Sequence, residues 1–251
     1  MYITTAALSD VSLRRIVLSG RKIMDFEYFA GLIPQLGMGM GVTIKIFIGT
    51  LVLSLPLGLL LSICRISRFK PLSWFVGLYL LIFRGTPLML QLFFIYFGLP
   101  FIKIVNPFTG DVFKLVLDRF PAALLAFVLN YAAYFAEIFR GGIISVQKGQ
   151  YEAAKALGLN SYKTMTLVII PQMLRSVVPP VANEAIVLVK DTALVSTIAL
   201  IDILRCAQQA VNRDMNVAAY ILVAIFYLLL TLVLTRIFEY LEKRLSVSVK
   251  V

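Results

Sequence analysis

Long apolar runs with few charges recur along the whole chain. A helix needs about 20 mostly apolar residues to cross the hydrocarbon core of a bilayer, and each of these runs is close to that length or longer. The pattern predicts five membrane spans, at about residues 37–63, 72–98, 121–140, 172–190 and 217–238. Prolines and polar residues interrupt the fourth span, which a membrane helix tolerates only where neighbouring protein or a water-filled path satisfies the freed backbone groups.

The segments between the spans carry weaker signals. The loop at 99–120 contains the turn dipeptides Asn106-Pro107 and Gly110-Asp111 and is expected to lie at the mouth of any path through the spans. After the fourth span, Ser196 is a suitable N-cap for a short amphipathic helix from Thr197 to Ala210. The sequence shows no internal repeat, so any two-fold symmetry requires a second subunit.

Composition supports a protein built entirely in the membrane. Of the 251 residues, 60% are hydrophobic and the mean hydropathy is +0.91, whereas soluble domains are about 45–50% apolar. Five spans and their loops leave no room for a separate soluble domain. We therefore expect an all-α integral membrane protein with one transmembrane domain at 37–251 and an extracytoplasmic or interfacial segment at 1–36.

The net charge of +11 does not indicate a nucleic-acid partner, because the Lys and Arg residues are scattered between apolar spans. Such residues concentrate in the cytoplasmic loops of membrane proteins. The loops after the first and third spans, together with the carboxyl-terminal tail, contain slightly more of them than the opposite set. This places the amino terminus outside the cell and the carboxyl terminus in the cytoplasm.

Residue types that usually carry catalysis are scarce. The chain has no histidine, and its two cysteines, Cys64 and Cys206, fall at opposite faces of the membrane. A metal centre, a Cys–His pair and a disulfide are therefore not expected. The sequence also lacks the Gly-x-x-x-x-Gly-Lys-Ser/Thr loop that binds nucleotide phosphates. We expect no catalytic residue, no metal and no cofactor in this chain.

Polar side chains inside the second and third predicted spans are candidates for a path. Pro87 should kink the helix beside Arg84, with Gln91 on the same face. Arg84 either lines a path or clamps the opened backbone. Asn130, Tyr134 and Glu137 share one face of the third span and would line a path or a subunit interface. Near the end of its span, Glu137 is equally suited to an ion pair that gates the path or anchors the loop.

The fourth span carries two adjacent polar stripes. Asn183 and Glu184 are each followed seven residues later by a charge, at Lys190 and Asp191. These four side chains either engage the ammonium and carboxylate groups of an amino acid or form an ion-pair network that holds the broken helix together.

The loop at about 141–171 predicts two short helices. Glu152 to Leu157 are strong helix formers, Gly158 suits a left-handed C-cap, Ser161 can cap the next helix, and Pro171 limits it. On these residues alone, the segment is an ordinary helical hairpin or a surface that offers small alanines to a partner.

This loop resembles the EAA motif of ABC importer permeases, in its Glu152-Ala153-Ala154 triplet, in Gly158 and in the later Pro171. Val168 and Ile170 stand where that family usually has isoleucine and leucine. The stretches Phe83 to Leu88 and Leu188 to Leu194 narrow the resemblance to permeases for polar amino acids. The likeness covers the chain from about residue 38 to its end.

The resemblance implies a type I importer permease in the plasma (inner) membrane of a prokaryote, with about five spans and a cytoplasmic coupling helix. Its expected partners are two ATPase subunits that bind ATP and Mg, a second permease that is identical or homologous, and an extracytoplasmic amino-acid-binding protein. Glu152, Ala153, Ala154 and Gly158 would contact the ATPase. The alternative function is an ion-coupled secondary amino acid transporter, a class that usually shows internal repeats or a longer chain.

Overall fold

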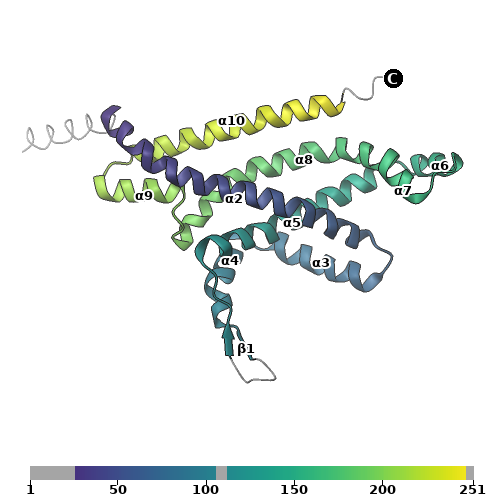
Figure 1. Cartoon of the computed structure of the whole chain (residues 1–251), viewed down its shortest axis with the longest axis horizontal. Helices are drawn as coiled ribbons and strands as arrows, with labels where there is room; N and C mark the ends of the chain where they lie inside the picture. The colour runs from purple at the N-terminus through teal and green to yellow at the C-terminus, as the bar shows by residue number, and fades with distance from the viewer. Residues whose placement is uncertain (1–25, 106–111, 247–251) are drawn as a thin grey trace, which may run out of the picture.

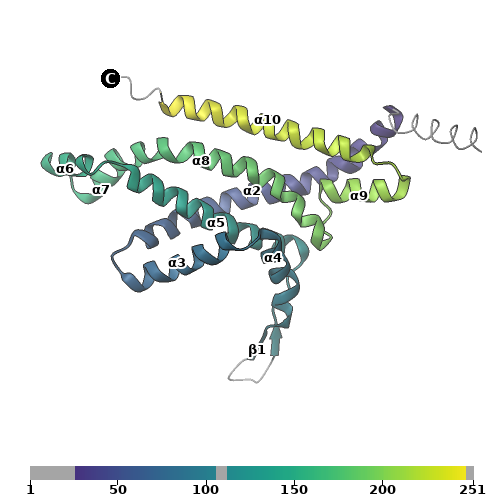
Figure 2. The ribbon, with the colours of Figure 1, turned by 180° about the vertical axis from the view of Figure 1, so that it is seen from behind.

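The structure is a computed structural model that describes residues 26–105 and 112–246 (Figure 1). Long helices lie side by side, with α5 in the middle of the bundle. Figures 1 and 2 show α2 and α8 running along α5, α10 on the outer side of α8, and α3 on the opposite side. The bounds of the four longest helices are α2 Phe26–Ile66, α5 Arg119–Ser145, α8 Ile170–Asp191 and α10 Ala218–Ser246.

The multi-span class predicted from the sequence is confirmed. Within residues 26–105 and 112–246, four helical segments are long and apolar enough to cross a membrane: Phe26–Ile66, Arg119–Ser145, Ser161–Ile198 and Ala218–Arg244. The second predicted span, 72–98, is not one continuous helix. It consists of Lys70–Gly85 and Leu88–Phe101, which are bent by 105° at the break between them, so the described part of the chain has five spans only if this pair counts as one.

Proline chemistry explains the break. Pro87 has no backbone N–H and its ring excludes the Phe83 carbonyl, and Thr86 and Pro87 are both extended, with ψ angles of 146° and 136°. Helix α3 (Lys70–Gly85) therefore ends after 16 residues, about 24 Å at 1.5 Å per residue. The chain continues at a new angle through α4 (Leu88–Phe93), a π turn η1 (Phe94–Gly98) and a 3₁₀ turn η2 (Leu99–Phe101).

A small hairpin follows this bent arm as a minor addition to the all-α membrane fold, which is confirmed. Strands β1 (Lys103–Val105) and β2 (Val112–Lys114) pair antiparallel, with Lys103 opposite Lys114. The hairpin projects away from the bundle (Figures 1 and 2). The sequence predicted only turns in this loop, and both turn dipeptides lie outside the described residues, as does most of the amino-terminal segment.

The loop between α5 and α8 contains the two predicted short helices, with two corrections. Helix α6 spans Lys148–Ala156, Gly158 is left-handed with φ 73°, and α7 spans Ser161–Lys163. Asn160, rather than Ser161, caps α7, because its side-chain oxygen accepts the Lys163 N–H at 2.9 Å. Pro171 does not stop the helix. A π turn, η3 (Thr164–Ile169), accommodates its missing N–H and leads directly into α8.

The short amphipathic helix lies later in the chain than predicted. A 3₁₀ segment, η4 (Thr192–Ile198), follows α8, and α9 spans Ile203–Asp214. Asp202 caps α9 by accepting the Arg205 N–H at 2.9 Å. Ser196 lies inside η4, before α9 begins, and its hydroxyl donates to the Ala193 carbonyl at 2.8 Å.

The core is built around α5. Phe127, Tyr131 and Phe135 are at most 2% exposed, and they pack against α2 and α8. Small residues allow the helices to approach closely: a Cβ at Gly58 would lie 2.7 Å from the Phe135 Cβ, and one at Gly142 would overlap Val177. Helix α10, in contrast, exposes many large apolar side chains, as expected of a surface that faces lipid.

Candidate functional site

Two buried amide side chains repair the break between α3 and α4. The Gln91 amide nitrogen lies 2.9 Å from the Phe83 carbonyl oxygen and 3.0 Å from the Thr86 carbonyl oxygen. The Asn130 amide donates to the Phe83 carbonyl and to the Gln91 side-chain oxygen, each at 3.0 Å. We call these four residues the amide cluster. They supply the backbone clamp that the sequence suggested for Arg84.

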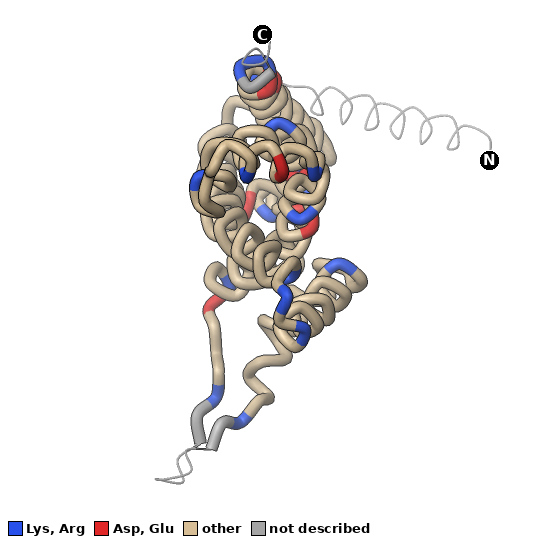
Figure 3. Tube along the Cα trace, turned by 90° about the vertical axis from the view of Figure 1, so that its right-hand side faces the viewer, with Lys and Arg blue, Asp and Glu red and all other residues tan. Residues whose placement is uncertain are grey.

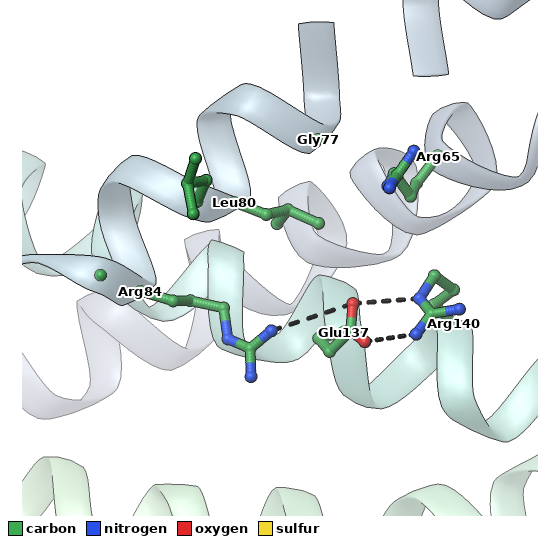
Figure 4. Close-up of a pocket in the computed structure, with 8 residues that line it drawn as sticks. Arg65, Gly77, Leu80, Arg84, Glu137 and Arg140 are labelled. Carbon is green, nitrogen blue, oxygen red and sulfur yellow. Dashed lines mark hydrogen bonds and ion pairs between the residues drawn. The ribbon is translucent and has the colours of Figure 1, made fainter. Parts of the chain in front are cut away.

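Arg84 faces a different space. Its side chain is 41% exposed, its Nη1 lies 3.9 Å from the Glu137 Oε2, and its Cζ lies 5.5 Å from the centre of the Tyr134 ring. Glu137 is held more closely by Arg140, which donates from Nε at 3.0 Å and also from Nη2 (Figure 4). The structure thus brings together Arg84, Tyr134 and Glu137, whereas Asn130, which was predicted to share their face, bonds to Gln91 and Phe83.

A cleft of about 510 Å³ opens between α3, α5 and the end of α2 (Figure 4). Three guanidinium groups and one carboxylate line it, those of Arg65, Arg84, Arg140 and Glu137. We call these four residues, with the surrounding α3 surface, the arginine cleft. The Arg65 guanidinium donates to the neutral carbonyl and hydroxyl oxygens of Ser73, at 3.0 and 2.8 Å. The lining therefore has a surplus of positive charge.

From the sequence, Arg65 and Arg140 were interpreted only as loop charges that orient the chain in the membrane. The three-residue spacing of Glu137 and Arg140 on one helix was a readable signal for their ion pair. No sequence signal connects Arg65 to Arg84, because only the antiparallel return of α3 along α2 brings the two arginines into one cleft.

The polar residues of α8 are less gathered than predicted. The half-buried Glu184 is close enough to Arg84 and Asp191 for their charges to interact. Asp191 accepts a hydrogen bond from the buried Tyr131 hydroxyl at 2.7 Å, whereas Asn183 and Lys190 are exposed. Within the described part of the chain, no ion pair joins these four α8 residues, so they do not form the network that was one alternative.

The predicted coupling residues lie at the far end of the bundle, on α6 and just beyond it (Figure 1). Glu152, Ala153 and Gly158 are exposed, but Ala154 is only 2% exposed and packs inside the protein. The Gln172 side chain of α8 donates to the Gln150 side chain of α6 at 3.0 Å. Viewed from this end, basic residues appear on several of the helices and on the loops between them (Figure 3).

Membrane-crossing helices, a broken second span and a surface helix between two spans define a multi-pass membrane permease. Residues 54–247 match the family described as the inner membrane component of binding-protein-dependent transport systems, and the chain belongs to this family. It is the permease subunit of an ABC importer, as the EAA-like loop predicted. Nothing in the comparisons supports the ion-coupled alternative.

Curated relatives align along nearly their whole length. The chain is 39% identical to the arginine transport system permease protein ArtQ of Bacillus subtilis, over 89% of this chain and 98% of ArtQ. It is 37% identical to the L-cystine transport system permease protein TcyB of the same organism, over 85% of this chain and 87% of TcyB. It is 35% identical to the glutamate/aspartate import permease GltK of Escherichia coli, over 88% and 97%.

Solved structures agree on the architecture. A chain in a crystal structure of an amino acid ABC transporter with histidines superposes with a TM-score of 0.77 at 32% identity, covering 88% of this chain and 99% of that one. The MetNI methionine ABC transporter gives a TM-score of 0.65 at 18% identity, with the same coverage, and supports the fold alone.

Proposed function

We propose that this permease moves a polar amino acid, delivered by an extracytoplasmic binding protein, across the cytoplasmic membrane of a prokaryote. The observation that carries the proposal is Arg84 on α3, which lines the cleft and has only a long contact, 3.9 Å, to the Glu137 carboxylate. The half-buried Glu184 on α8 carries the opposite charge and is near enough to interact electrostatically with Arg84. Relatives that transport arginine, cystine or glutamate and aspartate support the substrate class.

An amino acid in its zwitterionic form matches this arrangement. The substrate carboxylate would bind Arg84, whose contact with Glu137 is long at 3.9 Å, and the substrate ammonium would bind Glu184. Charge-assisted hydrogen bonds of this kind offset part of the free-energy cost of removing both groups from water. Tyr134 lies beside Arg84 and Asp191 lies near Glu184, so each would neighbour one end of the substrate, while Asn183 and Lys190 would contact the substrate elsewhere along the path.

Energy would reach this site through α6. The exposed Glu152 and Ala153 would contact an ATPase subunit, and the buried Ala154 fixes α6 to the rest of the permease. Because helix continues without a stop from Ser161 to Ile198, a displacement at α6 would move α8 and the Glu184 side chain with it. The left-handed Gly158 sets the angle between α6 and this long helix.

The rest of the assembly follows from the same proposal. ATP and Mg would bind to two separate ATPase subunits, because this sequence has no phosphate-binding loop. A second permease, identical or homologous, would complete the pathway. The end of the bundle that carries α6 would face the cytoplasm, with the carboxyl terminus on that side and the amino terminus outside.

Uptake into proteoliposomes tests the function. The vesicles would contain the permease with its ATPase and receive the binding protein and labelled arginine, glutamine, cystine or glutamate. We expect uptake that requires ATP and is lost in Glu152→Lys. Glu239→Lys makes the same charge change on an exposed residue of α10, away from α6, and should transport normally.

The two variants separate the possible failures. Uptake that continues without any ATPase, driven by an ion gradient, would overturn the ABC assignment of the energy source. Equal loss of uptake in Glu152→Lys and Glu239→Lys would instead show that the surface charge matters and would remove α6 from its proposed role.

A further inference from the structure

The three arginines of the arginine cleft are arranged along α3 rather than around one point. Arg65 reaches α3 at Ser73 and Gly77, where its guanidinium lies so close that a Cβ on Gly77 would be 3.2 Å from the Arg65 Cζ. Arg84 lies seven residues further along the helix, which is roughly 10 Å at 1.5 Å per residue. Arg140 and Glu137 line the cleft from α5. The positive charges thus form a ladder from the α3–α4 break toward the end of the bundle that carries α6.

The charge balance of this ladder calls for an anion. Glu137 accepts two hydrogen bonds from Arg140 and only a long contact from Arg84, and the hydrogen bonds of Arg65 go to neutral oxygens of Ser73. Unpaired charges at membrane depth are energetically unfavourable unless water or a counter-ion reaches them. The open cleft of about 510 Å³ provides the space for one.

We infer that the arginine cleft is an inner binding site for the carboxylate of the transported amino acid, which passes from Arg84 to Arg65 as the substrate is released. This inference rests on the proposed function for the identity of the anion, but not for the existence of the site. As the carboxylate moves toward the cytoplasm, each arginine takes over part of its interaction with the previous arginine. The carboxylate therefore never crosses the cytoplasmic half of the membrane without a cation beside it.

A lipid phosphate shares this chemistry but fits the depth less well. Phosphate groups stay at the membrane surface, whereas Arg84 lies at the carboxyl-terminal end of α3, beside the break in the middle of the second span. The Ser73 hydrogen bonds also hold the Arg65 guanidinium against Gly77 instead of letting it extend to the surface. The ladder therefore favours a small mobile carboxylate.

Charged thiol reagents test the cleft without relying on transport. Leu81 lines the cleft and is 70% exposed. In a background with Cys64→Ala and Cys206→Ala, Leu81→Cys would be treated with a sulfonate-bearing and a trimethylammonium-bearing methanethiosulfonate. The matched control is Ile82→Cys, whose neighbouring position is 49% exposed but does not line the cleft. We expect the anion-to-cation rate ratio to be about fivefold higher at position 81, since a unit charge a few ångströms away in a partly aqueous space has an effect of that order.

The source of the preference is tested by removing one charge. Arg65→Gln should lower the ratio at position 81 about threefold, as expected for one of several screened charges. Arg68→Gln, in the connection between α2 and α3 and outside the lining of the cleft, should leave it unchanged. If Arg65→Gln does not fold, Gly77→Ala keeps every charge but displaces the guanidinium, and it should lower the ratio by a smaller factor.

Protection identifies the anion. In the complex with ATPase and binding protein, the best-transported amino acid of the uptake panel should slow sulfonate labelling at position 81, and its α-carboxamide should not.

The lipid alternative is tested in the same assay. The measurement is made in phosphatidylcholine vesicles and repeated with phosphatidylglycerol added. Equal ratios at positions 81 and 82 would overturn the site, and protection by phosphatidylglycerol but not by the amino acid would assign it to lipid. If uptake is normal but the anion-to-cation ratios at positions 81 and 82 are equal, this inference fails and the proposed function stands. If uptake is absent but the ratio is higher at position 81, the proposed function fails and the anion site stands.

Discussion

The amide cluster and the arginine cleft begin at neighbouring residues of α3, Phe83 and Arg84, yet they follow opposite rules. In the amide cluster, Gln91 and Asn130 are 9% and 4% exposed and hydrogen-bond the carbonyl oxygens freed by the break. In the arginine cleft, the side chains of Arg84 and Glu137 are 41% and 30% exposed, and positive charge exceeds negative charge.

The difference separates structural polar residues from functional ones. A buried polar atom that lacks a partner costs about 1–3 kcal/mol, so a cluster that closes all of its hydrogen bonds has a sufficient explanation in folding. An open group of like charges has no such explanation, because it costs free energy until a ligand arrives. Of the nine residues predicted to line the path, Gln91 and Asn130 belong to the closed amide cluster, whereas Arg84 and Glu137 line the open arginine cleft, where we propose a functional role.

The largest effect is expected at the closed cluster. Asn130→Ala removes both hydrogen bonds of the amide and leaves the buried oxygen of Gln91 without its donor, so we expect a loss of about 3 kcal/mol in the free energy of unfolding. Thermal unfolding of the purified permease measures it. Asn183→Ala, at an exposed position of α8, is the matched control, and an equal loss in both variants would remove the amide cluster from its structural role.

A second test compares two adjacent glycines on α5. In Gly142→Ala the new methyl group overlaps Val177, so the contact between α5 and α8 must open, at a cost of about 2 kcal/mol. Gly141→Ala meets nothing within 4 Å and should be neutral or slightly stabilising, because alanine favours helix. Thermal unfolding of both variants gives the comparison. Equal stabilities would mean that the closed side of α5 is as loosely packed as its open side.

Arg84→Gln should have the reverse character, with a functional loss and little structural loss. Without the guanidinium, the substrate carboxylate loses a charge-assisted hydrogen bond, and we expect uptake to fall about tenfold. The free energy of unfolding should stay within about 0.5 kcal/mol of wild type, because the side chain is exposed and its one ion pair is long. Arg84→Lys keeps the charge and should recover part of the uptake. A variant that unfolds more easily but transports normally would place Arg84 with the structural residues.

The fold was predictable where a pattern extends over many residues. Long apolar runs located the four continuous spans of the described residues but placed one unbroken helix where α3 and the bent arm lie, and Gly158 gave the correct left-handed turn. Details that depend on neighbouring residues competing for the same hydrogen bond were not predictable. Asn160 caps α7 in place of the predicted Ser161, and the π turn η3 lets the helix continue past Pro171. The hairpin at 103–114 was missed because each strand has only three residues, too few for a hydrophobic alternation to stand out.

The site was predictable only in part, for a physical reason. Spacing along one helix shows which side chains share a face, and this correctly placed Tyr134 and Glu137 together. Spacing does not show which helix lies opposite. The meeting of Arg65 with Arg84, and of Asn130 with Gln91, depends on how α2, α3 and α5 pack, which the order of residues alone does not reveal.

The smallest effect tests an intermediate case, a carboxylate that is buried but only half paired. Asp202 is fully buried; one oxygen caps α9, while Oδ2 has no hydrogen-bond partner among the described residues. Burial raises the pKa of Asp202 to about 6, against the opposing hydrogen bonds from the backbone. The folded protein therefore holds this proton more tightly than the unfolded chain, whose Asp pKa is about 3.9. Stability should fall as the pH rises through that window, by about 1 kcal/mol between pH 5 and pH 7.

Asp202→Asn keeps a side chain that caps helices well and removes the charge. Its unfolding temperature should lose the wild-type slope between pH 5 and pH 7, and at pH 7 the variant should be the more stable protein. If the slope persists in Asp202→Asn, another group causes it, and Oδ2 must be adequately solvated in the folded state. A half-paired buried carboxylate would then cost nothing, and incomplete pairing would no longer be sufficient to distinguish the arginine cleft from the amide cluster.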